Sequence, residues 1–363
     1  MRKQHIDPEQ FLRRENNNFD LIRLLGACTV IFSHTYAIAW ADFAAEPFAQ
    51  ITDGKLAVGV PFLYMFFFLS GFLVTRSFLS SRNARHFLQK RILRIFPALV
   101  VMVLLVMLVV GPMFTELSWG EYFQQRHTWG FLRNISLLRL QTTLPGVFAD
   151  NPDPYFVQTN LWSVSLEFCW YLLTAVFGVL ALFRRRWSLV ALWVFLYGSM
   201  AFFGDWMLSK DIPLLDLELK PFVRVGIYYV SGMLFYLYRH QFLRLNPGLL
   251  VIIIPLWFLS VVNGLSDWTT PLFIPLFTLL FATLRLRGTQ TLARLGDPTY
   301  GMYIWGVPAQ QAIVAWFGPN WMVAFVGGLL LSYALGMLSW HLVEKRALRW
   351  KKSILDGRAR STG

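Results

Sequence analysis

The feature that most constrains the fold is a series of apolar runs, each long enough to cross a lipid bilayer. A helix rises 1.5 Å per residue and a bilayer core is about 30 Å thick, so a run of about 17 to 22 apolar residues predicts a spanning helix. Ten such runs lie at about 20–40, 58–79, 97–114, 161–183, 187–204, 222–238, 248–265, 271–284, 299–317 and 322–343. The eighth is short and begins at Pro271, which favours a tilted or partly re-entrant segment. The runs predict an all-α integral membrane protein, a bundle of about ten transmembrane helices.

Composition and charge support a membrane location. Charged residues make up 15% of the chain, whereas soluble domains carry roughly 25%. The net charge of +13 would suggest nucleic acid binding in a soluble protein, but here the basic residues are segregated. They cluster at Arg2 to Arg14, Arg82 to Arg94, Arg184 to Arg186, Arg239 to Arg244, Arg285 to Arg294 and Lys345 to Arg360. Because basic residues gather on the cytoplasmic side, we expect both termini in the cytoplasm, a multi-pass protein of a bacterial inner membrane, and no nucleic acid partner.

The same pattern predicts how the chain is divided. Residues 1–18 form a cytoplasmic N-terminal segment, residues 19–346 form the membrane domain, and residues 347–363 form a basic cytoplasmic tail. The longest connection, about 115–160, lies outside and carries aromatic and arginine residues of the kind that bind sugars.

Ionisable residues inside spans are costly, and each is a functional candidate. Arg23 and His34 lie eleven residues apart on the first run, hence on roughly the same helix face, and Glu167 lies on the fourth run. A histidine with a pKa near 6.5 suits proton transfer from a hydroxyl, and a carboxylate can orient it. The alternatives are a hydrogen bond that only fixes helix packing and, for Arg23, an interfacial side chain or a pair with Asp20.

Two further motifs lie near the spans. Arg91 and Arg94 in QKRILRIFP are three residues apart on one helix side, where two guanidiniums suit a phosphate; the alternative is a cytoplasmic anchor. Ser70 and Gly71 in FFFLSGF allow close helix approach, and Ser70 has no activating base nearby in sequence. Motifs such as HExxH or a Walker loop are missing from the sequence, so no metal site is predicted.

Five motifs together resemble membrane acyltransferase family three, whose members O-acylate bacterial surface glycans and similar acceptors. The similar segments are FDLIRLLGACTVIFSH with Arg23 and His34, FFFLSGF, KRILRIFP with Arg91, Arg94 and Pro97, LWSVSLEFCWYL with Trp162, Ser163, Glu167 and Tyr171, and LGDPTYGMYIWGVPAQQ with Tyr300 and Tyr303. They cover about residues 19–346. Two positions depart from the family pattern: Gly306 stands where many members have a histidine, and Thr299 replaces a frequent serine.

The resemblance implies transfer of an acyl group, commonly acetyl, from cytoplasmic acyl-CoA to a hydroxyl of a surface or exported polysaccharide or glycolipid. Acetyl-CoA would be a co-substrate, with no permanently bound cofactor, and membrane lipid a further partner. The resemblance assigns catalysis to His34 and Glu167, with His34 as a general base or a covalent acyl carrier. It implies that the donor contacts Arg23, Ser70, Arg91, Arg94, Tyr300 and Tyr303, and that the acceptor contacts Trp162, Ser163 and Tyr171. The sequence leaves the acceptor sugar and the oligomeric state open.

Two rival functions come from other classes. A transporter of a lipid-linked glycan or small anion also carries buried His, Arg and Glu residues along its pathway, although no internal repeat is detectable here. A non-catalytic membrane subunit would use the same polar residues only to hold helices together.

Overall fold

The structure, a computed structural model, describes residues 7–212, 217–284, 286 and 296–351. In these parts of the chain regular structure is helical, with three isolated β-bridges and no strand. The basic cluster predicted at 285–294, apart from Leu286, and the predicted tail beyond residue 351 lie outside the described residues. The all-helical prediction is confirmed for what the structure describes.

Each of the ten apolar runs overlaps a helix. These helices are α2 (Phe19–Trp40), α4 (Gly59–Leu79), α5 (Ala84–Leu105), α9 (Leu161–Val179), α10 (Arg186–Phe203), α11 (Leu219–Leu237), α13 (Leu250–Val262), α14 (Ser266–Ala282), α16 (Thr299–Phe317) and α17 (Trp321–Ser339). Six helices of the described chain are long and apolar enough to cross a membrane: Phe19–Trp40, Gly59–Leu79, Ala84–Phe114, Leu161–Val179, Arg186–Phe203 and Trp321–Arg349. The chain is therefore a multi-pass helical membrane protein.

Two of the other four helices, α13 and α16, show why the fold does not settle the predicted count of ten spans. Helix α13 has 13 residues and is about 20 Å long, which is shorter than a bilayer core. Helix α16 is interior, with most of residues 301–314 buried, so protein surrounds its Gln310 and Gln311. A helix enclosed by others does not need a uniformly apolar surface. The count of ten and the cytoplasmic position of the termini remain predictions.

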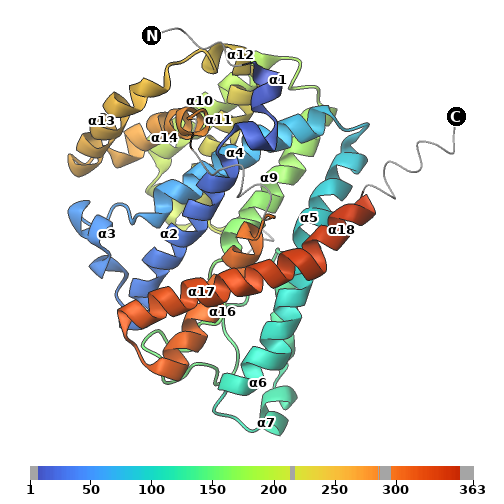
Figure 1. The fold of residues 1–363 in the computed structure, drawn as a ribbon, viewed down its shortest axis with the longest axis vertical. Coiled ribbons are helices and arrows are strands. Elements are labelled where there is room, and N and C mark those ends of the chain that lie inside the picture. The colour runs from blue at the N-terminus through green and yellow to red at the C-terminus, as the bar shows by residue number, and fades with distance from the viewer. Residues whose placement is uncertain (1–6, 213–216, 285, 287–295, 352–363) are drawn as a thin grey trace, which may run out of the picture.

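Shorter helices and irregular turns connect the long ones. They are α1 (Pro8–Phe11), η1 (Arg14–Asn16), η2 (Phe43–Ala45), α3 (Pro47–Ile51), η3 (Val106–Val110), α6 (Gly111–Phe114), α7 (Trp119–Gln124), α8 (Arg126–Gly130), η4 (Phe131–Ser136), η5 (Trp206–Ser209), α12 (Arg239–Phe242), η6 (Pro247–Leu249), η7 (Trp340–Glu344) and α18 (Lys345–Lys351). Helix α7, in the predicted external loop, lies at the opposite end of the long axis from α1 (Figure 1).

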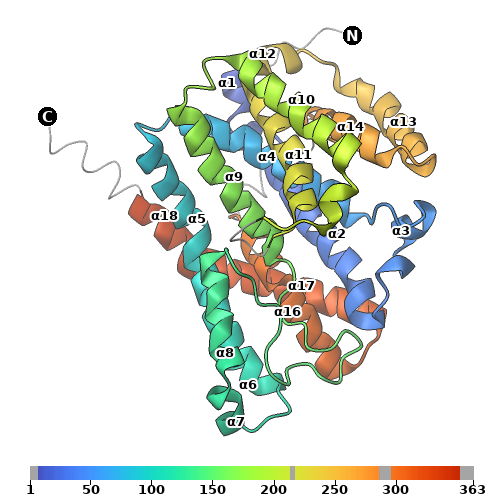
Figure 2. The ribbon, with the colours of Figure 1, turned by 180° about the vertical axis from the view of Figure 1, so that it is seen from behind.

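Glycines bring the central helices together. A Cβ on Gly71 of α4 would overlap the carbonyl oxygen of Tyr229 of α11, and a Cβ on Gly232 of α11 would overlap that of Phe68 of α4. The close approach expected at Gly71 is therefore made by α11. Helices α13 and α14 form the flank away from α5, as both ribbon views show (Figures 1 and 2).

The outer surface of the bundle is apolar. Phe202 of α10 is 78% exposed, Val251 of α13 78% and Leu330 of α17 63%. Large apolar side chains exposed over several neighbouring helices indicate a surface that another apolar phase covers. This surface fits a lipid-facing bundle with its polar residues turned inward.

Candidate active site

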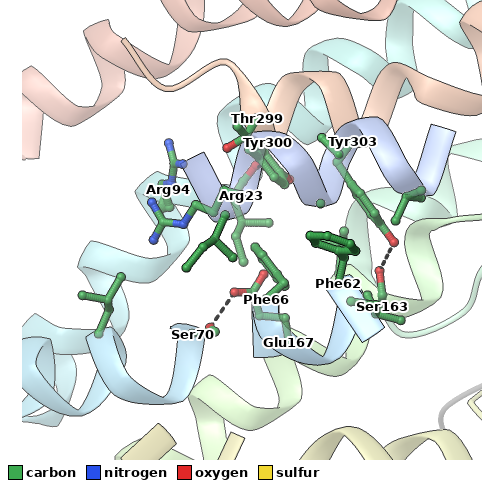
Figure 3. A pocket seen from close by; sticks show the side chains of 18 of the residues that line it. Arg23, Phe62, Phe66, Ser70, Arg94, Ser163, Glu167, Thr299, Tyr300 and Tyr303 are labelled. Carbon is green, nitrogen blue, oxygen red and sulfur yellow. Dashed lines mark hydrogen bonds between the residues drawn. The ribbon is translucent and has the colours of Figure 1, made fainter. Parts of the chain in front are cut away.

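Helices α2, α4, α5, α9 and α16 surround a cavity inside the bundle, here named the arginine cavity. It encloses about 1020 Å³ of empty space, including its open mouth. Nine of the eleven predicted site residues line it: Arg23, Ser70, Arg91, Arg94, Ser163, Glu167, Tyr171, Tyr300 and Tyr303. Figure 3 shows Arg23 and Arg94 toward one end and the Ser163–Tyr303 pair toward the other. Motifs spread over 280 residues of sequence thus meet at one place.

The carboxylate of Glu167 lies in the wall of this cavity. Ser70 Oγ donates a hydrogen bond to Glu167 Oε1 at 2.7 Å, and the Tyr171 hydroxyl, one helical turn further along α9, donates to the same oxygen. Among the residues that the structure describes, Glu167 makes no hydrogen bond or ion pair with His34. The expected contact between these two residues is therefore not present, and Glu167 orients Ser70 and Tyr171 instead.

At the arginine end, carboxylates compensate most of the positive charge. Arg94 binds Asp297 at 2.6 Å and Glu344 at 3.0 Å. Arg23 lies 3.7 Å from Asp297 and 3.6 Å from Asp20. Burial alone would raise the pKa of Asp297, but the guanidiniums of Arg94 and Arg23 hold this pKa well below its usual range. The carboxylate is thus held ionised between two arginines.

Asp297 and Glu344 were not among the predicted site residues. Asp297 directly precedes the Pro298–Thr299 start of α16, and the Thr299 hydroxyl donates a hydrogen bond to it at 2.6 Å. Glu344 ends the π-helical turn η7, a distortion that often accompanies functional positions. The available signals were an acidic residue three positions before Tyr300, in the segment LGDPTYGMYIWGVPAQQ, and another directly after the last apolar run.

Arg91 differs from Arg94 although both line the cavity. Its guanidinium donates to Ser77 Oγ at 3.0 Å and lies 5.6 Å from the ring centroid of Tyr171. No described carboxylate forms an ion pair with it, and its Nε is buried without a hydrogen-bond partner. The two guanidiniums predicted as a pair are therefore not equivalent, since Arg91 keeps an uncompensated charge.

The far end of the cavity is lined by neutral hydroxyls. The Tyr303 hydroxyl shares a hydrogen bond with Ser163 Oγ and lies 3.3 Å from the backbone oxygen of Asn160. Tyr300 lies toward the arginine end instead (Figure 3), where its ring centroid is 5.9 Å from the Arg94 guanidinium and its hydroxyl donates to the backbone oxygen of Ile95 at 3.1 Å. Trp162 packs at the edge of the hydrophobic core instead, and lines neither this cavity nor the one described next.

His34 lies in a second, smaller cavity, here named the His34 crevice. The crevice is narrow, with no room for a water molecule between its side chains, and it shares Ala27, Val30 and Tyr303 with the arginine cavity. In the described part of the chain His34 makes no hydrogen bond or ion pair. Gly306, the position where many family members carry a histidine, lines the same crevice.

The two cavities give the site a direction. Arg23 and His34 are both on α2, eleven residues or about 16 Å apart along the helix axis. An elongated molecule with an anionic end can bind the guanidiniums and reach Ser163 and Tyr303, and Tyr303 also borders the crevice of the imidazole. The arrangement suits group transfer between one partner held by charge and another held near His34.

Comparisons with known proteins agree with this geometry. The acyltransferase 3 family, described as an acyltransferase domain, matches residues 16–341. Nodulation protein 10 of Rhizobium leguminosarum bv. viciae is 29% identical, with 94% of this chain and 96% of that protein covered. The O-acetyl transferase of Shigella phage Sf6 is 27% identical, with 92% and 96% covered. No solved structure matches the chain significantly. Because the family match spans nearly the whole chain, the protein belongs to the acyltransferase 3 family and is an acyltransferase that transfers groups other than aminoacyl groups.

Proposed function

We propose that the protein transfers an acyl group, acetyl in the first instance, from cytoplasmic acyl-CoA to a hydroxyl of a surface or exported polysaccharide or glycolipid. The transfer would take place within a bacterial inner membrane, with both termini on the cytoplasmic side. The observation that carries this proposal is that the arginine cavity and the His34 crevice adjoin each other, with Ala27, Val30 and Tyr303 bordering both. The name of the phage relative, O-acetyl transferase, supports acetyl as the group transferred.

The donor would bind from the arginine end. Arg91 has an uncompensated guanidinium there, and a guanidinium binds phosphate oxygens bidentately. Arg94 and Arg23 already contact Asp297. They would therefore bind the phosphate groups of the donor either in addition to Asp297 or in place of it. The acyl thioester would then lie near Ser163 and Tyr303, at the far end of the cavity (Figure 3).

His34 would act on the acceptor. As a general base, its imidazole takes the proton of the acceptor hydroxyl while the hydroxyl oxygen attacks the thioester carbonyl. The carbon–sulfur bond breaks, and the CoA thiolate receives the proton from the imidazolium, which gives an ester and free CoA. In the covalent alternative, His34 first takes the acyl group from CoA and then passes it to the hydroxyl. Glu167 would act on the donor side by holding Ser70 and Tyr171 beside Arg91.

The test compares surface glycans from cells with and without the gene by mass spectrometry. Loss of an acyl mass from an otherwise intact glycan, restored by the gene on a plasmid, is the expected result. Loss of the whole glycan from the surface would instead favour the transporter. An unchanged glycan and unchanged glycolipids would contradict the proposal.

A further inference from the structure

The His34 crevice contains two buried oxygen atoms that no group satisfies. Asn160 Oδ1 and Gln310 Oε1 have no hydrogen-bond partner, and their residues are 3% and 0% exposed. Both residues line the crevice together with His34. A buried acceptor without a partner costs about 1 to 3 kcal/mol, so two of them beside one unbonded imidazole require an explanation.

The amide groups are fixed so that their oxygen atoms stay free. Gln310 Nε2 donates to the backbone oxygen of Ile31 at 2.9 Å and to Thr35 Oγ1 at 2.7 Å. Asn160 Nδ2 donates to the backbone oxygen of Tyr303 at 2.5 Å. Rotating either amide by half a turn would bring its oxygen against a carbonyl oxygen. The nitrogen ends are thus held by the protein, and the oxygen ends are left buried without a donor.

The chemistry of the crevice defines what can satisfy these oxygens. Apart from His34, it is lined by neutral side chains, namely Ala27, Val30, Ile31, Asn160, Tyr303, Gly306, Val307 and Gln310. Such a site offers a cation no carboxylate and an anion no guanidinium. It suits a neutral group with at least two hydrogen-bond donors, as found in adjacent hydroxyls of a sugar or another polyol.

We propose that the His34 crevice widens by side-chain movement to become the acceptor subsite and that Asn160 and Gln310 position the acceptor. Their two oxygens accept hydrogen bonds from hydroxyls next to the one that His34 deprotonates. This inference rests on the proposed function and adds to it the groups that select the acceptor hydroxyl. A site built to bind hydroxyls discriminates strongly against ligands that lack them, because its own polar groups are then left unpaired.

Gly306 leaves room for one methyl group in the wall of the crevice. A Cβ added there would meet only Ile31 Cγ1 at 3.5 Å and Asn160 Nδ2 at 3.9 Å, both ordinary contacts. The glycine is therefore not required by helix packing, in contrast to Gly71, where a Cβ would overlap backbone. A side chain longer than a methyl at 306 would extend into the crevice.

The test uses full-length Gln310→Met and Asn160→Leu, which keep volume and remove the oxygen atoms. Acyl groups on the host's surface glycan are quantified and assigned to their hydroxyls by NMR, and acetyl-CoA binding is measured on the purified protein. We expect at least tenfold less acylation, or acylation of a different hydroxyl, with acetyl-CoA affinity within twofold of wild type. Thr35→Val is the matched control, since it removes one bond to Gln310 Nε2 but keeps Oε1; its acylation should stay within about twofold.

Unchanged acylation at the same hydroxyl in both amide variants would overturn the inference, as would an equal loss in Thr35→Val. Where an amide variant does not fold, a comparison of Gly306→Leu with Gly306→Ala tests the acceptor subsite instead. Leucine should reduce acylation far more than alanine, with acetyl-CoA affinity retained in both, and equal acylation would overturn the inference. A wild-type protein that acylates no glycan would refute the proposed function itself and the acceptor subsite with it.

Discussion

The arginine cavity and the His34 crevice share Ala27, Val30 and Tyr303. They differ in electrostatics, because the first is lined by charged side chains and the second by neutral ones apart from His34. In the first, Arg94 and Arg23 are neutralised by carboxylates, and Arg91 alone among the described cavity arginines lacks one. The second has no charged wall and two neutral oxygens without partners.

This difference follows from what a membrane interior tolerates. An unpaired charge there costs several kcal/mol, whereas a neutral acceptor without a partner costs about 1 to 3 kcal/mol. The protein can therefore keep free acceptors deep in the bundle, while Arg23 and Arg94 are paired with carboxylates. It follows that a charged donor and a neutral acceptor can be recognised in adjacent places without competing for the same groups.

The largest effect is expected from His34→Ala, which removes the reacting group of the crevice and leaves the arginine cavity intact. Loss of a general base reduces a rate about 10²- to 10⁴-fold, so acyl transfer should fall by at least 10²-fold. Acetyl-CoA affinity, measured on the purified protein, should change less than twofold. Transfer within tenfold of wild type would exclude His34 from the chemistry.

The same variant also separates the two roles proposed for His34. Wild-type protein incubated with acetyl-CoA but without acceptor should gain an acetyl group if His34 is a covalent carrier, and His34→Ala should not. Intact mass spectrometry after rapid acid quenching makes this comparison. An unmodified wild-type protein that still transfers acetyl supports the general-base role.

The second-largest effect is expected from replacing Arg91, which, unlike Arg94, has no ion pair with a described carboxylate. Arg91→Leu removes an uncompensated guanidinium without breaking an ion pair, so the fold should be retained. A charge-assisted hydrogen bond contributes about 1.5 to 3 kcal/mol, which corresponds to roughly a 10- to 150-fold weaker Kd for acetyl-CoA. Arg91→Lys should lie between, because an ammonium cannot bind phosphate bidentately. A normal Kd in Arg91→Leu would show that the donor binds elsewhere.

These contrasts also indicate what sequence can and cannot reveal about such a site. Run length predicted where helices form, and residue spacing placed Arg23 and His34 on roughly the same helix face, because helical rise and turn depend only on residue number. The sequence does not give the rotation of each helix about its own axis. That rotation determines that Glu167 contacts Ser70 and Tyr171 rather than His34. It also decides that Trp162 points away from both cavities.

The ion pairs of Arg94 show a second limit. Its partners Asp297 and Glu344 lie 203 and 250 residues away in sequence, and only the packing of α5 against α16 and η7 brings them together. Neither local propensity nor hydropathy contains that information. The oxygens of Asn160 and Gln310 that lack a hydrogen-bond partner could not be predicted from sequence either. A missing partner is recognised only when the three-dimensional surroundings of the oxygen are known.

The third prediction concerns Asp297→Asn, which removes the shared carboxylate of the arginine cavity. The pair is partly buried, so the loss of stability should lie between that of surface and buried pairs, about 1 to 2 kcal/mol. Since the folded-state pKa of Asp297 is depressed, its contribution is present above the unfolded pKa of about 4 and is lost as the pH falls below it.

Thermal unfolding in detergent at pH 7 and at lower pH measures this effect. The midpoint difference between wild type and Asp297→Asn should be largest at pH 7 and should shrink as the solution is acidified. The Arg91→Leu variant serves as the control, because it breaks no ion pair among the described residues and should unfold near wild type at each pH. A difference between wild type and Asp297→Asn that grows on acidification would contradict the assigned ionisation.

The smallest effect is expected from Tyr171→Phe, which deletes one hydroxyl of the Glu167 network and keeps the ring beside Arg91. One hydrogen bond contributes about 0.5 to 1.5 kcal/mol, so the Kd for acetyl-CoA should weaken roughly 2- to 10-fold. Tyr171→Leu also removes the cation–π contact and should weaken it further. In both variants the acylated hydroxyl of the glycan should stay the same, because Tyr171 lines the arginine cavity and not the crevice. A shift of the acylated hydroxyl in Tyr171→Phe would mean that donor and acceptor are recognised by one continuous site rather than by two.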